Sequence, residues 1–462
     1  MPVVRFSCVF FCFKSLQSVK KFIQTLKNIW SIEELRSKII VTITLVAVYR
    51  FGAHIVLPGI DPTRLDLSSA KSGALGLLDA FAGGAFSQAS ILALGIMPYI
   101  SASIFMQLMT ILTPSMQKLQ KEGESGRKKI NQWTRLLTVA VTIVQASAYV
   151  AYLRQMGQDA IIASYSEYFW LSTTIILTAG TLFVMWLGER ITDKGLGNGT
   201  SLIIMVGILA RLPQSTMQEW TAKSTLGGGG LLLFIIEIAF LVAVIMGLIV
   251  LIQGVRKIPV NYAKQIVGGR QFTGARQFLP VKVNSAGVMP IIFAQAIMFL
   301  PTLFSYTSFE SGQGIARIFS NPMDAWYMVI YAVVVIAFTF LYTALIFNPK
   351  QIADDLKRNN GFIPGVKPGQ PTADYIGSIM DKITLPGAVL LAIVGIMPGF
   401  AQRLGITQGF ASFFGGTSLL IMVGVVLDTL QQIETHLLMR QYDGLMKSGR
   451  IQGRQSVTSP AV

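Results

Sequence analysis

The stretch from Gly83 to Pro114, GGAFSQASILALGIMPYISASIFMQLMTILTP, carries the clearest structural signal in the chain. A Gly-rich break at its start separates the moderately apolar stretch 74–81 from a long apolar run that carries Pro98 near its middle. The run 88–112 predicts a helix of about 37 Å, which is longer than the bilayer core of about 30 Å. The whole stretch therefore predicts a broken membrane helix. Irregular backbone at membrane depth survives only against protein or water, so the break predicts a cavity and favours a transport function.

The composition of the 462-residue chain excludes a soluble domain. Hydrophobic residues make up 52% of the chain, charged residues make up 13%, and the mean hydropathy is +0.58. These values, with apolar runs that recur throughout, are typical of a polytopic membrane protein. The only cysteines, Cys8 and Cys12, lie near the N-terminus, and we expect both to be reduced because no disulfide framework or metal-ligand spacing surrounds them.

Residues 1–38 predict an N-terminal segment that precedes the first span. The short apolar piece 3–13 is followed by Lys14 instead of a small-residue cleavage site, which makes it a poor signal peptide. From Val19 to Lys38, basic and apolar residues alternate at helical spacing. That pattern is typical of an amphipathic helix on a membrane surface and equally of a solvated lead-in.

Ten apolar segments follow and predict ten transmembrane helices. We place them at 39–57, 88–112, 136–153, 169–187, 198–213, 230–254, 285–303, 326–347, 384–400 and 413–433. An even number of spans puts both termini on one side of the membrane. The loops on that side hold 30 of the 38 Lys and Arg residues, and the opposite loops hold 7. Since these residues collect on the cytoplasmic side, we expect both termini to be cytoplasmic.

Two large basic loops, 255–284 and 348–383, lie on the same side as the termini. The first has six basic residues and no acidic one, and its β-branched and aromatic residues between glycines predict a projecting hairpin. The second has a Gly/Pro-rich tip that carries Lys367. Such loops act either as orientation signals and lipid-facing charge or as a docking face for an acidic protein or ribosomal RNA, and their length favours docking.

The polar residues inside the predicted spans do not form the pattern of a catalytic site. The ionisable residues Arg50, Glu237 and Asp428 are scattered without a nearby partner in sequence, so a proton relay is weakly supported. The spacing of His54 and His436 assembles neither a catalytic triad nor a metal site. We therefore expect no enzyme activity, no metal and no cofactor.

The spans divide into five before residue 214 and five after it. An odd number in each part gives halves of opposite topology, as in many transport proteins. This arrangement leaves two classes open, a channel and a secondary transporter for a small solute. A transporter needs a midplane site with paired charges or coordinating oxygens.

Five long motifs in order resemble the SecY family, whose members form the centre of the bacterial protein-conducting channel. They are ALGIMPYISASIFMQL (93–108), KEGESGRKKINQWTR (121–135), ERITDKGLGNGTSLII (189–204), VNYAK with LPVKVNSAGVMPIIFA (260–294) and ADDLKRNNGFIPGVKPGQPTADYI (353–376). The resemblance covers about residues 20 to 445.

The resemblance implies an hourglass pore between two halves that close like a clamshell. A plug half-helix on the external side falls on residues 74–82, and its apolar members are Leu75, Leu77, Leu78 and Phe81. The pore constriction of the family is a ring of apolar side chains, which falls on Ile96, Ile100, Ile204, Ile292 and Ile421. Thr200 stands where the family often has an apolar residue, which predicts a partly polar ring on that side.

The resemblance also implies a lateral gate between the second and seventh spans. Its polar positions match Gln107, Gln145 and Asn284, which from the residues alone favour hydrogen bonds between helices. The basic loops resemble docking sites for the SecA motor and the ribosome, at Arg256, Lys264, Arg270 and Lys367. Lys367 replaces the common arginine of the family and so lacks its bidentate fork. SecE and SecG are the implied partner subunits.

We therefore expect an all-α protein of the bacterial cytoplasmic membrane, with a cytoplasmic N-terminal segment 1–38 and a cytoplasmic tail 434–462. The N-terminal half spans 39–213 and the C-terminal half spans 214–433. The implied function is the translocation of unfolded secretory polypeptides and the lateral release of hydrophobic segments into membrane lipids. A partner motor or the translating ribosome drives it.

Overall fold

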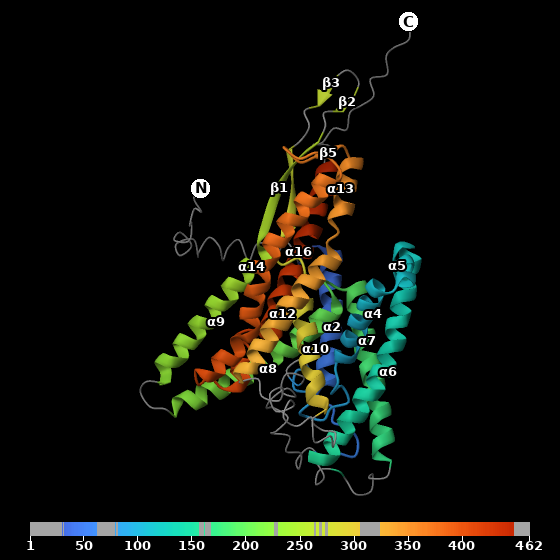
Figure 1. Ribbon diagram of the computed structural model, residues 1–462. Coiled ribbons are helices and arrows are strands. Elements are labelled where there is room, and N and C mark those ends of the chain that lie inside the picture. Colours follow the sequence, from blue (N-terminus) through green and yellow to red (C-terminus); the bar gives the residue numbers. More distant parts are fainter. Residues whose placement is uncertain are drawn as a thin grey trace.

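The chain folds as a bundle of long helices with a small β-structure projecting from one end (Figure 1). The computed structural model describes residue 30 and residues 32–61, 79, 82–156, 161, 168–225, 230–262, 265–267, 270–272, 276–304 and 324–447. Its helices are α2 (Glu33–Gly52), α4 (Met97–Leu112), α5 (Pro114–Lys121), α6 (Glu124–Met156), α7 (Phe169–Lys194), α8 (Gly199–Ser224), α9 (Gly230–Gln253), α10 (Met289–Phe304), α12 (Ala325–Ile346), α13 (Pro349–Arg358), α14 (Gln370–Arg403), α15 (Gln408–Ala411) and α16 (Gly416–Lys447).

Several of these helices are suited to a membrane. Among the described residues, seven helical segments are long and apolar enough to cross one, and they fall on α6, α7, α8, α9, α12, α14 and α16. The most apolar is the segment of α9, with a mean hydropathy of 3.1, and it lies at an edge of the bundle (Figure 1). The chain is therefore a multi-span membrane protein.

The predicted helix over 88–112 is wrong in its first part, because residues 82–96 form turns and α4 begins only at Met97. The backbone is left-handed at Gly83, Gly84, Ala89 and Gly95, which a continuous helix does not allow. Pro98 then occupies the first turn of α4, where its missing N–H does no harm. With 16 residues, α4 is about 24 Å long. The irregular backbone therefore continues further along the chain than predicted, up to residue 96.

The turns over 82–96 are stabilised by hydrogen bonds and by burial. Leu57 N–H donates to the carbonyl of Ala89 at 2.9 Å, and Ile91 N–H donates to that of Ile55 at 2.9 Å. Tyr149 of α6 donates its hydroxyl to the carbonyl of Phe86 at 2.7 Å. Irregular backbone is tolerated at membrane depth when protein groups satisfy it in this way.

The described helices pack around two apolar cores with a third between them. One core joins α6 and α7 to the turns over 82–96. Another joins α9, α10, α12, α14 and α16. A third apolar cluster lies between them and contains buried residues of α2, α7, α8 and α16.

The two basic loops fold together into one unit, and the predicted hairpin is confirmed. Strand β1 (Val255–Tyr262) pairs antiparallel with β4 (Arg276–Lys282), and β5 (Gly361–Phe362) of the second loop pairs with the other edge of β1. The short strands β2 (Gln265–Val267) and β3 (Arg270–Phe272) pair with each other. Ile258 of β1 and Ile376 of α14 share one buried core. Because its first turns pack in this core, α14 begins well before the predicted span 384–400.

Candidate functional site

Five isoleucines that the sequence places far apart lie in one apolar cluster. Ile204 of α8 and Ile421 of α16 are buried, as is Ile96 in the turn before α4. Ile100 of α4 and Ile292 of α10 are partly buried and pack against them. These are the five positions predicted for the pore ring. The structure thus brings together five side chains that have no hydrogen-bonding group.

Thr200, the polar position predicted beside the ring, directs its hydroxyl to its own helix end. The hydroxyl donates to Asn198 Oδ1 at 2.7 Å, and the same oxygen accepts the Thr200 backbone N–H at 3.1 Å. Asn198 is thereby the N-cap of α8. The methyl group of Thr200 packs beside Gly188 of α7.

The predicted plug is represented by few described residues. Leu75, Leu77, Leu78 and Phe81 lie outside the described residues. Asp79 is described and has no exposed surface. Its Oδ2 lies 2.5 Å from Nη2 of Arg211 on α8, and its Oδ1 accepts the backbone N–H of Ser87 at 2.8 Å. The sequence pattern does not indicate this ion pair, because its partners are separated by several spans.

Gly83 fits tightly between two helices next to Asp79. Its φ angle is +67°, and a Cβ there would lie 2.8 Å from the Cα of Gly207 on α8. Arg50 of α2 donates from Nη1 to the Gly83 carbonyl at 3.3 Å. Arg50, which had no partner in the sequence pattern, thus holds the turn in place.

The predicted gate residues have different surroundings. Gln107 of α4 is half-buried and accepts a hydrogen bond from the hydroxyl of Tyr342 on α12 at 2.8 Å. Asn284 is buried in the turn before α10, and its Oδ1 has no hydrogen-bond partner within the described part of the chain. Gln145 is half-buried on α6. Only Gln107 is thus shown bonded across to another helix.

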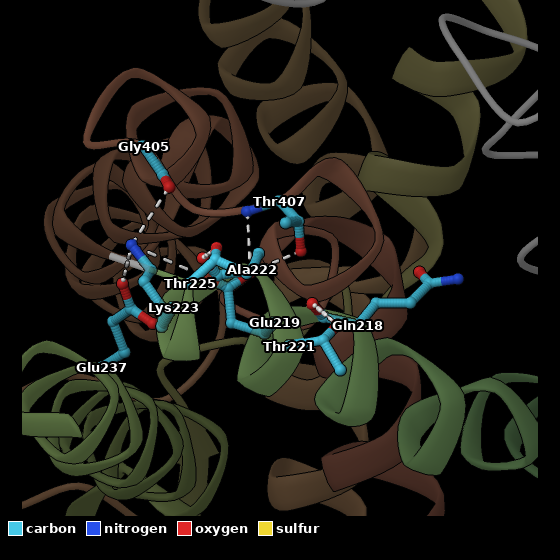
Figure 2. Close-up of polar contacts among 9 residues, drawn as sticks. All are labelled: Gln218, Glu219, Thr221, Ala222, Lys223, Thr225, Glu237, Gly405 and Thr407. Atoms are coloured by element: carbon cyan, nitrogen blue, oxygen red, sulfur yellow. Dashed lines mark hydrogen bonds and ion pairs between the residues drawn. The ribbon is translucent and has the colours of Figure 1, made fainter. Parts of the chain in front are cut away.

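A buried cluster of charges joins α8, α9 and the segment after α14 (Figure 2). Nζ of Lys223 lies 2.9 Å from Oε1 of Glu237 and 3.6 Å from Oε1 of Glu219, and it donates to the Gly405 carbonyl at 3.2 Å. Oε2 of Glu219 accepts the backbone N–H of Thr407 at 2.8 Å and also its hydroxyl. The prediction that Glu237 lacks a nearby partner is wrong, because the C-terminal end of α8 lies beside the first turns of α9.

Three of the four predicted docking residues are described, and they lie on or beside the β-structure. Arg256 is exposed on β1, and Lys367 is exposed between β5 and α14. Arg270 belongs to β3, and Lys264 lies outside the described residues. Strands β1 and β5 share one sheet, so the two loops present their basic residues on a common projection (Figure 1).

No group of three or more His, Cys, Asp or Glu residues within the described ranges has an arrangement that could hold a metal ion. Polar groups do cluster around Asp79 and around Lys223. They form ion pairs there, with Arg211 and with Glu237 respectively. The candidate site therefore consists of the cluster of five isoleucines, the ion pair of Asp79 beside the turns over 82–96, and the hydrogen bond that joins α4 to α12.

Known proteins resemble the chain over almost its whole length. A family model described as SecY matches residues 90–430. The chain is 41% identical over 441 residues to protein translocase subunit SecY of Thermus thermophilus, covering 93% of this chain and 99% of the relative. It is 39% identical over 457 residues to the protein of that name from Chlamydia muridarum, covering 93% of this chain and 100% of the relative.

Solved structures share the fold. A protein-conducting channel has a TM-score of 0.62 to this chain at 17% identity, covering 87% of this chain and 92% of that one. Sec61 in the canine ribosome–channel complex has a TM-score of 0.58 at 17% identity, with coverage of 87% and 92%. The family model and the two relatives agree with this fold, and the chain belongs to the SecY family.

Proposed function

We propose that the protein is a channel subunit that translocates unfolded secretory polypeptides across the cytoplasmic membrane and releases hydrophobic segments sideways into lipid. The observation that carries the proposal is the cluster of five isoleucines from α8, α10, α16 and the region of α4. Branched aliphatic side chains close on one another or around an extended chain of any sequence. They exclude water and ions by dewetting without selecting among substrates.

The architecture proposed for this function has ten spans. Helices α2, α4 and α10 add to the seven candidate segments, and each corresponds to one of the predicted spans. Five spans in 39–213 and five in 214–433 make two inverted halves. The separate apolar cores on either side of the isoleucine cluster support this division. Residues 74–82 form the plug, and Asp79 supports its placement against α8.

The docking face is proposed to be the cytoplasmic β-projection. Arg256, Lys264, Arg270 and Lys367 are its contacts with a motor ATPase of the SecA type or with the ribosome. The shared sheet of the two basic loops supports one continuous face, and Sec61, which has the same fold, occurs in a ribosome–channel complex. Both termini, residues 1–38 and 434–462, are then cytoplasmic, and SecE and SecG complete the channel.

The protein is proposed to carry out no bond chemistry of its own. ATP hydrolysis by the motor, or translation by the ribosome, supplies the free energy. A segment apolar enough to prefer lipid leaves through the gate that Gln107, Gln145 and Asn284 border, in a partition decided by transfer free energy.

A site-specific crosslink tests the channel. A photo-reactive residue replaces Ile204 in the full chain in bacterial membranes, and a secretory chain is stalled midway through export. The matched control is Val242 on the exposed side of α9. We expect crosslinks from position 204 to the stalled chain and none to a chain without a signal sequence. Crosslinks from position 242 with silence at 204 would show that the isoleucine cluster does not line the path.

A further inference from the structure

A pocket of about 530 Å³ lies between the start of α13 and the first part of α14. Its lining comes from the stretches 348–350 and 370–382. Pro349 lies close to Gly377, since a Cβ on Gly377 would be 3.8 Å from Cγ of Pro349. Helix α12 ends at Ile346, directly before the first of these stretches. The pocket is therefore at the end of a membrane-crossing segment, on the side of the bundle that carries the β-structure (Figure 1).

The pocket contains charged side chains of both signs. Lys350 and Lys382 line it together with Asp374 and Asp381. Within the described part of the chain, the side chains of Lys350, Lys382 and Asp381 form no ion pair and no hydrogen bond. Oδ1 of Asp374 accepts a hydrogen bond from Nε2 of Gln370 at 3.1 Å. Two ammonium groups and a carboxylate are thus available to a ligand that carries both charges.

An apolar surface of α14 continues from the pocket towards the middle of the membrane. Leu385, Val389 and Ile393 are exposed, and we call them the apolar stripe. They follow Lys382 at helical spacing, which puts all four side chains on one face of α14. The predicted span 384–400 contains the stripe and begins just after Lys382. Exposed apolar side chains within a span face hydrocarbon, so the charged pocket adjoins a lipid-facing surface.

We propose that the pocket binds the headgroup of one ethanolamine phospholipid, with the acyl chains along the apolar stripe. Lys350 and Lys382 donate from Nζ to the phosphate oxygens. The carboxylates of Asp374 and Asp381 accept hydrogen bonds from the ammonium group of the ethanolamine. The proposal requires only a chain that spans a membrane, and it is independent of the proposed channel function.

The arrangement of charges distinguishes this headgroup from two others. Choline carries methyl groups on its nitrogen, so it has no N–H to donate to a carboxylate. A glycerol headgroup leaves the phospholipid with a net negative charge and places no cation beside Asp381, whose charge then repels it. Ethanolamine is the headgroup that satisfies the lysines and the carboxylates at once.

A bound lipid joins the two helices that form the pocket. Lys350 belongs to α13 and Lys382 belongs to α14, so one phosphate group between them connects the helices. Helix α13 leads directly into β5, which pairs with β1. The lipid therefore steadies the base of the β-projection.

The experiment uses the full chain with its partner subunits, purified in a mild detergent. Native mass spectrometry measures the binding of ethanolamine, choline and glycerol phospholipids with identical acyl chains. We expect the ethanolamine lipid to bind about tenfold more tightly than the other two, because a charge-assisted hydrogen bond is worth about that factor. Equal binding of the three lipids, or tighter binding of the anionic glycerol lipid, overturns the proposal.

Two sets of substitutions separate the phosphate contacts from the ammonium contact. The double variant Lys350→Gln with Lys382→Gln removes both cations, and we expect it to bind all three lipids about tenfold or more weakly. Asp381→Asn is expected to weaken only the ethanolamine lipid, and the glycerol lipid should bind it at least as tightly as before. D381N with an unchanged preference overturns the proposal. If the double variant does not accumulate, D381N alone decides by its headgroup preference.

Lys357→Gln and Asp354→Asn are the matched controls. Both residues are exposed on α13, carry the same charges and do not line the pocket. We expect both variants to bind the three lipids as the unmodified chain does. Losses equal to those of the pocket variants show a general effect of surface charge and overturn the proposal.

A soluble headgroup tests whether the ligand is a lipid. Glycerophosphoethanolamine carries the same phosphate and ammonium groups without acyl chains. At a concentration equal to that of the lipid, we expect it to displace none, because it cannot contact the apolar stripe. Displacement at that concentration shows that a free phosphodiester suffices, and it overturns the assignment of the pocket to a membrane lipid.

Discussion

Asp79 is a carboxylate without exposed surface, and its charge is balanced by a guanidinium from another element. Arg211 lies 2.5 Å from it, with a side chain that is 21% exposed. Removal of one member of a buried ion pair is strongly destabilising, because the other charge is left without compensation. Loss of this pair therefore weakens the closed arrangement of the turns over 82–96 much more than loss of a surface pair.

Asp79→Asn is expected to make the resting channel leak. If residues 74–82 form the plug, the neutral side chain no longer pairs with Arg211 and the plug is held less firmly against α8. The ion flux through membrane vesicles then rises about tenfold or more. Arg135→Gln is the control, since it breaks an exposed ion pair with Glu189 and should leave the flux unchanged. The double variant D79N/R211M removes both charges and should leak less than D79N. A tight D79N channel present at normal level contradicts this role of the pair.

The sequence predicted the five clustered isoleucines better than it predicted the polar contacts between helices. Four of the isoleucines were found because they lie in long motifs, and Ile421 was found from the short stretch SLLI. The structure places all five in one cluster, while their role as a ring stays a proposal. Tyr342 and Lys223 were missed because their partners come from other helices, and periodicity says which face of a helix is apolar without saying what meets it. The available signal for this ion pair was Lys223, which follows the predicted span 198–213, and Glu237, which lies early in the next predicted span.

At the scale of elements, the segment before α4 shows where hydropathy fails. Residues 91–96 are as apolar as the helix that follows, so an apolar run predicted one continuous span. Apolar residues are equally suited to buried turns, and the backbone follows the left-handed conformation at Ala89 and Gly95. By contrast, the predicted spans 326–347 and 230–254 agree closely with α12 and α9, which have no such interruption.

Gly83→Ala is expected to destabilise this segment more than Gly287→Ala. Both glycines have nearly the same φ angle, +67° and +66°. The left-handed backbone therefore costs about 1–2 kcal/mol in either variant. A Cβ at Gly287 meets nothing within 4 Å, whereas one at Gly83 lies 2.8 Å from Gly207. Thermal unfolding of the purified complex in detergent checks the order, and equal midpoints for the two variants contradict the tight fit at Gly83.

At the scale of the whole molecule, the charged cluster around Lys223 joins three parts of the C-terminal half. Lys223 near the end of α8 pairs with Glu237 of α9, and through Glu219 and Thr407 the cluster reaches the segment after α14. Lys223 is buried with two carboxylates, so its charge is needed to compensate them. The cluster therefore holds the ends of α8 and α9 against the segment after α14.

Lys223→Met is expected to lower the free energy of unfolding by about 3–5 kcal/mol, since it leaves two buried carboxylates unpaired. The double variant K223M/E237M removes one of them, while Glu219 keeps its hydrogen bonds to Thr407. We expect it to recover a large part of the loss. Protease resistance in detergent over a temperature range provides the measurement. A double variant no more resistant than K223M shows that charge compensation is not the reason for the loss.

The sheet of β4, β1 and β5 has a mechanical consequence. Its strands come from both basic loops, and the chain enters and leaves these loops through α9, α10, α12 and α14. We therefore expect a force applied to either loop at the proposed docking face to be shared by both loops and, through the shared core, to reach α14. Under the proposed function, a push at the tip of the projection then turns a group of helices together and does not merely bend one loop.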